Sequence, residues 1–325
     1  MIRLTDIKKV FDGRGIAGLH GVNLEIAEGM IMAVMGPNGS GKTTLINIIA
    51  KKINADKGEL TTQGEIRLFS EQENLPDINV QKFLIQKISP EVEDEKKIQL
   101  ARDLADIFEF TFQLRQNLNQ LSAGQRQKVL LAGELINRPS LMLLDEPFAH
   151  LDPHTRTDIL NSLFSYLRRQ EISVLWVTHN LEEALRFSDT VGLLNFGKFE
   201  QMSTPYELIN HPRNLFVAQF LGYENFLPIK KIDKEWTTPW GVYTHSTLAE
   251  DEGILVIPED AFILNDSGLK GKVTHSYLKG LSQRVTVEVG DKSFQVKIRR
   301  NSPLLTPEST LFLQVNLAEC FLIPL

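Results

Sequence analysis

Residues 36–44 constrain the fold of this chain more than any other stretch. They read Gly-Pro-Asn-Gly-Ser-Gly-Lys-Thr-Thr, follow the apolar run at 30–35 and precede a helical pattern that begins at Leu45. When a strand ends in a glycine-rich turn and continues into a helix, successive backbone N–H groups point inward at an anion, and the helix dipole adds its positive end. The stretch therefore predicts a cradle for phosphate groups between a buried strand and a helix.

Two side chains of this cradle indicate a nucleotide bound with a divalent cation. Lys42 would reach the β- and γ-phosphates as a point charge, and Thr43 would offer its hydroxyl to Mg²⁺. A glycine-rich turn with a solvated lysine is the alternative, but the strand and the helix on either side of the motif disfavour it. We therefore expect nucleotide contacts from Gly36, Pro37, Asn38, Gly39, Ser40, Gly41, Lys42, Thr43 and Thr44.

The size and charge of the chain narrow the classes of protein to consider. Its 325 residues, 42% of them hydrophobic, suffice for two domains with full cores. A formal net charge of −6 gives no global electrostatic case for binding nucleic acid. No stretch approaches the roughly 18 apolar residues that span a bilayer, so we expect a chain that is neither secreted nor membrane-spanning by itself. The single cysteine, Cys320, fits a reducing compartment.

Residues 141–147, Leu-Met-Leu-Leu-Asp-Glu-Pro, form a second motif. Four apolar residues that end in two carboxylates are typical of a buried parallel strand that delivers acids to its carboxyl end. Asp145 would help to hold Mg²⁺ together with Thr43. Glu146 could orient or deprotonate an attacking water molecule, and a carboxylate that caps a nearby helix is the alternative.

The remaining periodicity places helices between and after these motifs. The apolar spacing is helical from 80 to 118, and the excess of acidic residues at 71–110 is read as a solvated helix face. Ser122 stands where a helix N-cap is expected. A further helix at 156–169 and a strand at 173–177 complete an α/β unit, and His179 lies just past the end of that strand.

Five motifs in this order resemble those of the nucleotide-binding subunit of an ABC transporter, and the resemblance covers nearly the entire chain. Residues 36–44 match the phosphate loop, and 121–125, Leu-Ser-Ala-Gly-Gln, resemble the signature sequence of the family. Residues 141–146 match the Mg²⁺ strand with its catalytic glutamate. Residues 149–152 correspond to the dimer-communication loop, and His179 to the switch histidine. Other classes of phosphate-loop protein lack the signature sequence.

The resemblance implies that the active site is shared between two subunits. Ser122 and Gly124 would contact the γ-phosphate of the ATP that the other subunit binds, and Gln125 and Asp152 would belong to the same ATP site. Each ATP would then lie between two chains. Taken alone, the signature could be only a capped helix.

The family also implies roles for single residues outside these motifs. Phe11 would stack on adenine, whereas an isolated phenylalanine is more often part of a core. His179 would hydrogen-bond the γ-phosphate and help to position the attacking water, and a surface histidine is the alternative. The expected catalytic set is Glu146, His179, Lys42 and Gln72.

The chain departs from the family pattern at three places. Gly133 and Glu134 replace an Arg-Ala pair or a similar one, and Ala123 replaces a common glycine. The segment 58–72 is shorter than the β-hairpin that family members usually carry. The register of the glutamine loop is therefore open. Gln72 is the expected Mg²⁺ and water ligand, whereas a gapless alignment back from Pro76 would place Ser70 there.

The carboxyl-terminal part of the chain has a different character. It contains several short alternating runs, and Gly290-Asp291 between two of them is a hairpin signal. Many short strands with such turns predict a small β-barrel. The region resembles the oligonucleotide-fold-like accessory domain of ABC importers. We expect an ATPase domain at 1–224, with a helical subdomain at about 73–137, and a β-barrel accessory domain at 225–325.

The predicted fold class is α/β: a P-loop ABC ATPase domain with a helical subdomain, followed by a small all-β, oligonucleotide-fold-like domain. The resemblance implies the ATP-binding subunit of an importer, which hydrolyses Mg-ATP at a head-to-tail dimer interface on the cytoplasmic face of the membrane. Its partners would be a second copy or a related ATPase subunit, permease subunits and, indirectly, a solute-binding protein, without nucleic acid. The alternatives are the ATPase of an exporter and a soluble ABC-type ATPase acting on nucleic acid or ribosomes.

Overall fold

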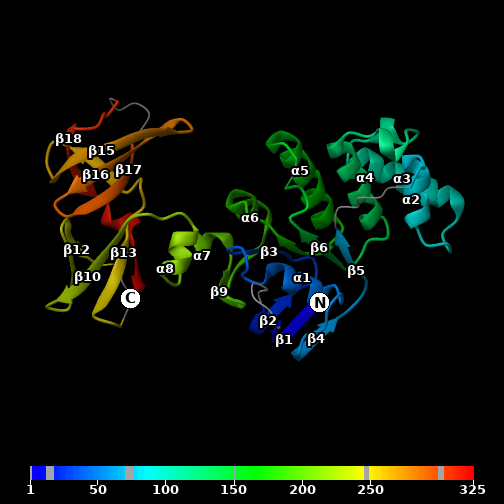
Figure 1. Ribbon diagram of the computed structural model, residues 1–325, viewed down its shortest axis with the longest axis horizontal. Helices are drawn as coiled ribbons and strands as arrows, with labels where there is room; N and C mark the ends of the chain where they lie inside the picture. Colours follow the sequence, from blue (N-terminus) through cyan, green and yellow to red (C-terminus); the bar gives the residue numbers. More distant parts are fainter. Residues whose placement is uncertain (1, 12–17, 70–75, 150, 245–248, 299–303) are drawn as a thin grey trace. The chain divides into compact units, whose positions relative to one another are not determined.

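The computed structural model describes the chain except for residues 1, 12–17, 70–75, 150, 245–248 and 299–303 (Figure 1). The chain divides into two compact units, Met1–Pro205 and Tyr206–Leu325. Among the described residues, no helix is both long enough and apolar enough to cross a membrane. The first unit contains mixed α/β structure and the second consists mainly of strands, in agreement with the predicted fold class.

The central sheet of the first unit has six strands in the order β5-β6-β7-β3-β8-β9. Neighbouring strands are parallel as far as β8, and β9 is antiparallel to it. Because parallel strands end at the same edge of a sheet, the carboxyl ends of β3, β6 and β7 meet there. The strands are β3 Ile31–Met35, β5 Ile66–Phe69, β6 Leu141–Asp145, β7 Ser173–Val177, β8 Thr190–Asn195 and β9 Lys198–Ser203.

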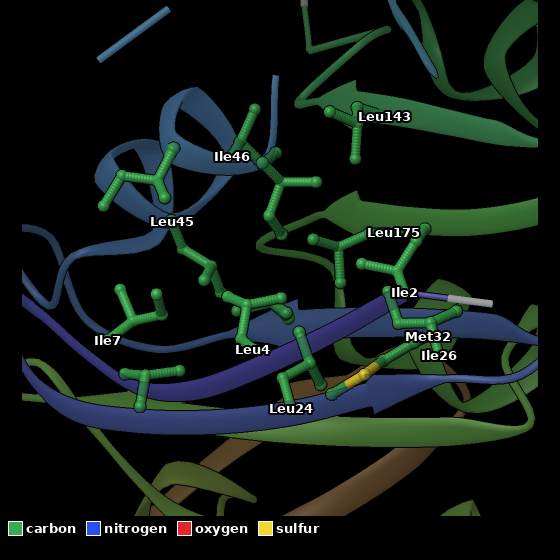
Figure 2. Close-up of a cluster of buried hydrophobic side chains, with 14 of the residues drawn as sticks. Ile2, Leu4, Ile7, Leu24, Ile26, Met32, Leu45, Ile46, Leu143 and Leu175 are labelled. Carbon is green, nitrogen blue, oxygen red and sulfur yellow. The ribbon is translucent and has the colours of Figure 1, made fainter. Parts of the chain in front are cut away.

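A smaller antiparallel sheet, in the order β2-β1-β4, completes the core of this unit. It consists of β1 Ile2–Lys9, β2 Leu19–Ile26 and β4 Lys57–Thr62. Its apolar face packs against α1, Lys42–Ile49, and the central strands in one cluster, shown in Figure 2. A register shift between Leu4 and Ile7, where Asp6 has a φ of 47°, keeps Ile7 on the buried face.

Two further helices cover the central sheet near β7. They are α5, Pro153–Arg169, and α6, Leu181–Phe187. The ring of Phe164 on α5 stacks on Phe187 with 4.8 Å between centroids and meets Trp176 of β7 edge-on at 4.9 Å. This aromatic cluster holds both helices against the strand that precedes His179.

The helical part of the first unit consists of α2 Val80–Lys87, α3 Asp94–Ile107 and α4 Ala123–Leu135, with 3₁₀ turns at Thr111–Gln113 and Leu118–Gln120. The stretch 80–118 is therefore mostly helical, as predicted, but it is broken after α2 at Ser89-Pro90. Proline lacks the N–H that a continuing helix needs and disfavours helical geometry in the residue before it.

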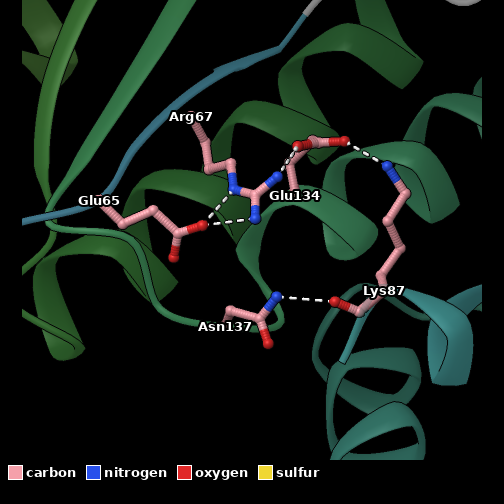
Figure 3. Close-up of polar contacts among 5 residues, drawn as sticks. All are labelled: Glu65, Arg67, Lys87, Glu134 and Asn137. Atoms are coloured by element: carbon pink, nitrogen blue, oxygen red, sulfur yellow. Dashed lines mark hydrogen bonds and ion pairs between the residues drawn. The ribbon is translucent and has the colours of Figure 1, made fainter. Parts of the chain in front are cut away.

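Gly133 and Glu134, which depart from the family pattern, both serve packing in this helical part. A Cβ at Gly133 would lie 3.0 Å from Cε1 of Phe83, so the glycine lets α4 approach α2 closely. Glu134 is only 13% exposed; Nζ of Lys87 donates to it at 2.8 Å, and NH1 of Arg67 on β5 lies 3.9 Å away (Figure 3). Asn137 adds a 2.7 Å hydrogen bond from Nδ2 to the carbonyl of Lys87. The acid therefore links two helices and a strand.

The second unit contains two five-stranded antiparallel sheets, in the orders β12-β11-β10-β13-β19 and β14-β18-β15-β16-β17. Gly290-Asp291 forms the two-residue turn between β16 and β17, as predicted, with a φ of 63° at the glycine. The strands are β10 Phe226–Ile232, β11 Glu235–Thr238, β12 Gly241–Tyr243, β13 Glu252–Val256, β14 Phe262–Asn265, β15 Leu269–Lys279, β16 Ser282–Val289, β17 Lys292–Ile298, β18 Thr310–Val315 and β19 Phe321–Pro324, with a 3₁₀ turn at Leu317–Glu319.

Two short helices, α7 Pro205–Asn210 and α8 Leu215–Phe220, precede these strands. Ala218 on α8 packs in an apolar cluster with residues of β13 and β19, and the hydroxyl of Tyr223 donates to the carbonyl of Ile209 at 3.0 Å. These contacts join the segment 206–224 to the second unit. The compact units therefore divide at Pro205, whereas the motif-based domain boundary at 224 stays a prediction.

Candidate functional site

The phosphate loop connects the buried end of β3 to the start of α1. Gly36, Gly39 and Gly41 have φ values of 150°, 79° and 108°, which favour glycine. A Cβ at Gly36 would lie 2.0 Å from the carbonyl oxygen of Leu194 on β8, so a larger residue cannot occupy this position without moving the strand. The sequence positions of these glycines therefore follow from the turn and from its close contact with the sheet.

Lys42 lies inside the loop that it terminates. Its side chain is buried, and Nζ donates to the carbonyl oxygens of Gly36 and Pro37 at 2.9 Å each. Burial lowers the pKa of Lys42, and the nearby carboxylates of Glu146 and Asp145 oppose that shift. The lysine is thus positioned among inward-facing backbone groups, beside two acids.

A cavity of about 450 Å³ lies against this loop. Its lining residues are Phe11, Asn38, Gly39, Ser40, Gly41, Lys42, Thr43, Thr44, Asn47, Ile53 and Glu146. Ser40 is 2% exposed, and its Oγ has no hydrogen-bond partner among the described residues. A buried hydroxyl without a partner is costly, so this cradle fits a ligand that carries hydrogen-bonding oxygens, as phosphate groups do.

Asp145 ends β6 beside the start of α1. Its carboxylate accepts a hydrogen bond from the Thr43 side chain. Burial raises the pKa of Asp145, as does the charge of Glu146, and the Thr43 hydrogen bond and the charges of Lys42 and His179 oppose the shift. A hydroxyl and a carboxylate are oxygen ligands suited to Mg²⁺. Among the described residues, no group of three or more His, Cys, Asp or Glu side chains could hold a metal ion by itself.

Glu146 and His179 are brought together by neighbouring strands. Asp145 pairs with Val177 in the parallel register of β6 and β7, so the residues that follow both strands emerge side by side. Nε2 of His179 lies 2.5 Å from Oε1 of Glu146, with side chains 46% and 38% exposed. Glu146 has a φ of 49°, which is rare for a residue with a side chain and turns the chain immediately after the strand. Glu146 lines the cavity. His179 is not among the lining residues but contacts the Glu146 side chain.

The signature residues lie at the N-terminus of α4 and do not line the cavity. Ser122 is the N-cap: its Oγ accepts from the N–H of Gln125 at 3.3 Å, and Oε1 of Gln125 accepts from the N–H of Ser122 at 3.1 Å. This is a capping box. A Cβ at Gly124 would lie 2.8 Å from Cγ2 of Thr155 on α5, so the glycine permits close packing of the two helices.

Asp152 is the N-cap of α5, without a capping box, and is likewise absent from the cavity lining. Its Oδ1 accepts from the N–H of Thr155 at 3.0 Å, and hydrogen bonds to Thr155 lower the pKa of Asp152. Within one chain, the structure therefore assembles the phosphate loop, the two acids and His179. Ser122, Gly124, Gln125 and Asp152 of the same chain lie outside the lining of the cavity.

The remaining predicted residues have mixed outcomes. Phe11 lines the cavity, with Nζ of Lys9 5.5 Å from the centroid of its ring. Gln72 and Ser70 lie outside the described residues, so the choice between them stays a prediction. Sequence reasoning missed Asn47 and Ile53 in the cavity lining. For Asn47 the available signal was helical spacing, because it follows Thr43 and Thr44 by four and three positions on α1.

Comparisons with known proteins agree with this geometry. The family described as "ABC transporter" matches residues 19–149. The chain is 31% identical over 321 residues to the spermidine/putrescine import ATP-binding protein PotA of Vibrio cholerae, covering 89% of this chain and 84% of that protein. It is also 31% identical to the protein of the same name from Mesoplasma florum, with 90% and 89% covered. The dimeric post-hydrolysis structure of the ATP-binding cassette MJ0796 with ADP and Pi has a TM-score of 0.55 at 28% identity, covering 63% of this chain and 99% of that one.

Proposed function

Because this chain belongs to the ABC transporter family as an importer-type ATP-binding subunit, we propose that it hydrolyses Mg-ATP at sites that two copies share, and so drives permease subunits. ATP binding and hydrolysis coupled to transport are the activity of this family. For this chain we propose, in addition, that two copies share each ATP site, that Mg²⁺ binds with the ATP, and that the chain acts on membrane partners. The exporter and the ribosome-directed or nucleic-acid-directed alternatives are not favoured, since the relatives are named import proteins.

One observation carries the proposal of a shared site. Residues 38–44 of the phosphate loop and Glu146 line the cavity, whereas Ser122 and Asp152 of the same chain are exposed N-caps outside that lining. The N-terminus of α4, whose cap is the neutral side chain of Ser122, suits an anion. A second copy placed head to tail would bring this N-terminus to the phosphates, and a relative of known structure, MJ0796, is described as dimeric with ADP and Pi.

The residues of one chain would divide the chemistry in the following way. Lys42 and the loop amides would bind the β- and γ-phosphates, and Thr43 and Asp145 would hold Mg²⁺, which neutralises phosphate charge when bound. Glu146 would accept a proton from the attacking water, and His179, in contact with Glu146, would orient that carboxylate and the γ-phosphate. Phe11 would stack on the base, and Gln72 would complete the Mg²⁺ and water ligands.

Glu146→Gln tests this assignment. The amide keeps the shape of the side chain but cannot accept a proton, so we expect ATP binding to persist, hydrolysis to fall by at least about 100-fold, and an ATP-bound dimer to accumulate in size-exclusion chromatography. Hydrolysis at the parental rate would show that Glu146 is not the base. Lys42→Ala, which removes a phosphate ligand, should instead weaken nucleotide binding itself.

The membrane partners require a separate experiment. We infer that the chain lies on the cytoplasmic face of the membrane, where permease subunits hold it. A solute-binding protein would deliver the solute to those permease subunits. Affinity purification of the full chain from detergent-solubilised membranes should recover permease subunits, and recovery with ribosomes or DNA alone would contradict the proposal. The names of the relatives make spermidine and putrescine the first substrates to test in the resulting complex.

A further inference from the structure

We propose that Asn47 and Ile53 form the nucleoside end of the nucleotide cavity, with the carboxamide of Asn47 as its hydrogen-bonding group. This inference rests on the proposed function, because it assumes that the cavity binds ATP. It assigns a specificity role to two residues that belong to none of the sequence motifs.

The position of Asn47 on α1 places it beyond the phosphate subsites. Thr43, Thr44 and Asn47 lie on one helical face and all line the cavity. The Cβ atoms of residues three or four positions apart on a helix lie about 5–6 Å from each other. The cavity therefore continues past the loop amides and Lys42, along the side of α1, to Asn47.

The backbone of Asn47 also fixes Ile53. Its carbonyl oxygen accepts from the N–H of Lys52 at 2.9 Å and from that of Ile53 at 3.3 Å, which folds the chain back after α1. Ile53 is half-buried, packs against the main apolar cluster and lines the same cavity. The end of the cavity away from the loop thus combines an aliphatic surface with a neutral polar group.

The chemistry of these side chains suits a nucleoside better than a phosphate. The carboxamide of Asn47 is half-buried and makes no hydrogen bond with any described residue. A carboxamide offers two donors and an acceptor without charge, which matches the polar edge of a base or the hydroxyls of ribose. Ile53 and the ring of Phe11 provide apolar surface for the faces of the base. The phosphates already have Lys42 and the loop amides.

The test compares the binding of two ligands, one that contains a nucleoside and one that has only phosphate groups. Binding of ATP and of inorganic tripolyphosphate to the full chain is measured by displacement of a fluorescent ATP analogue. Asn47→Ala should weaken ATP binding about two- to tenfold, the contribution of one hydrogen bond, and leave tripolyphosphate binding unchanged. Asn54→Ala is the matched control, since Asn54 is exposed and outside the cavity lining, and it should change neither affinity.

Folding is not expected to obscure the result, because alanine has a higher helix propensity than asparagine, and thermal unfolding of the variant checks this. Equal weakening for both ligands, or unchanged ATP binding, would overturn the inference. Failure of the proposed function looks different. In that case the parental chain would bind neither ligand, or Lys42→Ala would leave both affinities unchanged.

Discussion

At the scale of single residues, the motifs predict which side chains gather at the nucleotide site, but not the pairs they form. Asp145 ends one strand, and Glu146 and His179 follow the ends of two neighbouring strands, so their meeting at one edge can be expected from the run of apolar residues before each. The 2.5 Å contact between Glu146 and His179 depends on β6 and β7 being neighbours in register. That pairing links residues far apart in the chain, which local patterns do not encode.

Asn47 and Ile53 show a different reason for incomplete prediction. Asn47 has only its helical spacing from Thr43 and Thr44 as a signal in the sequence, and Ile53 has none. Half-buried residues near the end of a helix usually serve packing. Their presence in the cavity lining follows from how α1 and the segment after it fold back, a tertiary feature.

The raised pKa of Asp145 leads to a prediction at this scale. A carboxyl group whose pKa is higher in the folded state than in the unfolded state destabilises the fold where it is charged, and this cost disappears as pH falls below the unfolded value. Asp145→Asn should therefore raise the midpoint of thermal unfolding at pH 7.5. The gain should shrink as the pH approaches about 4, the unfolded value for Asp.

Thermal unfolding of the full chain across this pH range measures the effect. Glu91→Gln, which changes an exposed acid between α2 and α3, is the control. A lower midpoint at pH 7.5, or a gain that does not depend on pH, would show that burial and the neighbouring charge of Glu146 do not penalise the Asp145 carboxylate.

At the scale of elements, periodicity predicts the existence of the helices and strands better than their ends. The helical stretch 80–118 is divided at Ser89-Pro90, and the helix predicted from 156 already begins at Pro153, capped by Asp152. The contacts between elements are less visible in the sequence. Glu134 reads as an ordinary helix residue, yet it joins α4 to α2 and lies near β5.

Removing Glu134 should therefore destabilise the first unit. Glu134→Ala leaves Lys87 and Arg67 without their buried partner, and we expect a loss of about 1–2 kcal/mol in the free energy of unfolding. Urea unfolding of the full chain measures it. Glu91→Ala, which changes an exposed acid in the segment between α2 and α3, should stay within about 0.5 kcal/mol. Equal effects of the two substitutions would contradict a linking role for Glu134.

At the scale of the whole molecule, composition and strand pattern predict two folded parts, and each compact unit has its own apolar cluster. The division at Pro205 precedes the motif-based boundary at 224 because α8 packs on strands of the second unit. The boundary at 224 reflects where the sequence motifs of the ATPase domain end. The boundary at Pro205 reflects which segments pack together.

Separate cores predict two transitions in calorimetry of the full chain. Mg-ATP at about 100 times its dissociation constant should stabilise only the first unit, by about 2.7 kcal/mol. Asn225→Ala should lower only the transition of the second unit. Asn225 is 2% exposed, donates to the carbonyls of Ile257 and Gln295, and accepts from the N–H of Gln295. If calorimetry shows a single transition, and both Mg-ATP and Asn225→Ala shift its midpoint, the two units do not unfold independently.

The most direct test of the shared site is to mix two inactive chains. Lys42→Ala disables the phosphate loop, and Ser122→Asp keeps the N-cap of α4 but places a negative charge where the partner's γ-phosphate would bind. In a mixed dimer, the loop of the Ser122→Asp chain meets the intact Ser122 of the Lys42→Ala chain. We predict that Mg-dependent ATPase activity, nearly absent from each variant alone, recovers on mixing to about a quarter of the parental rate, since half of the dimers are mixed and each has one intact site. Activity that stays at the level of the separate variants would contradict a site built from two copies.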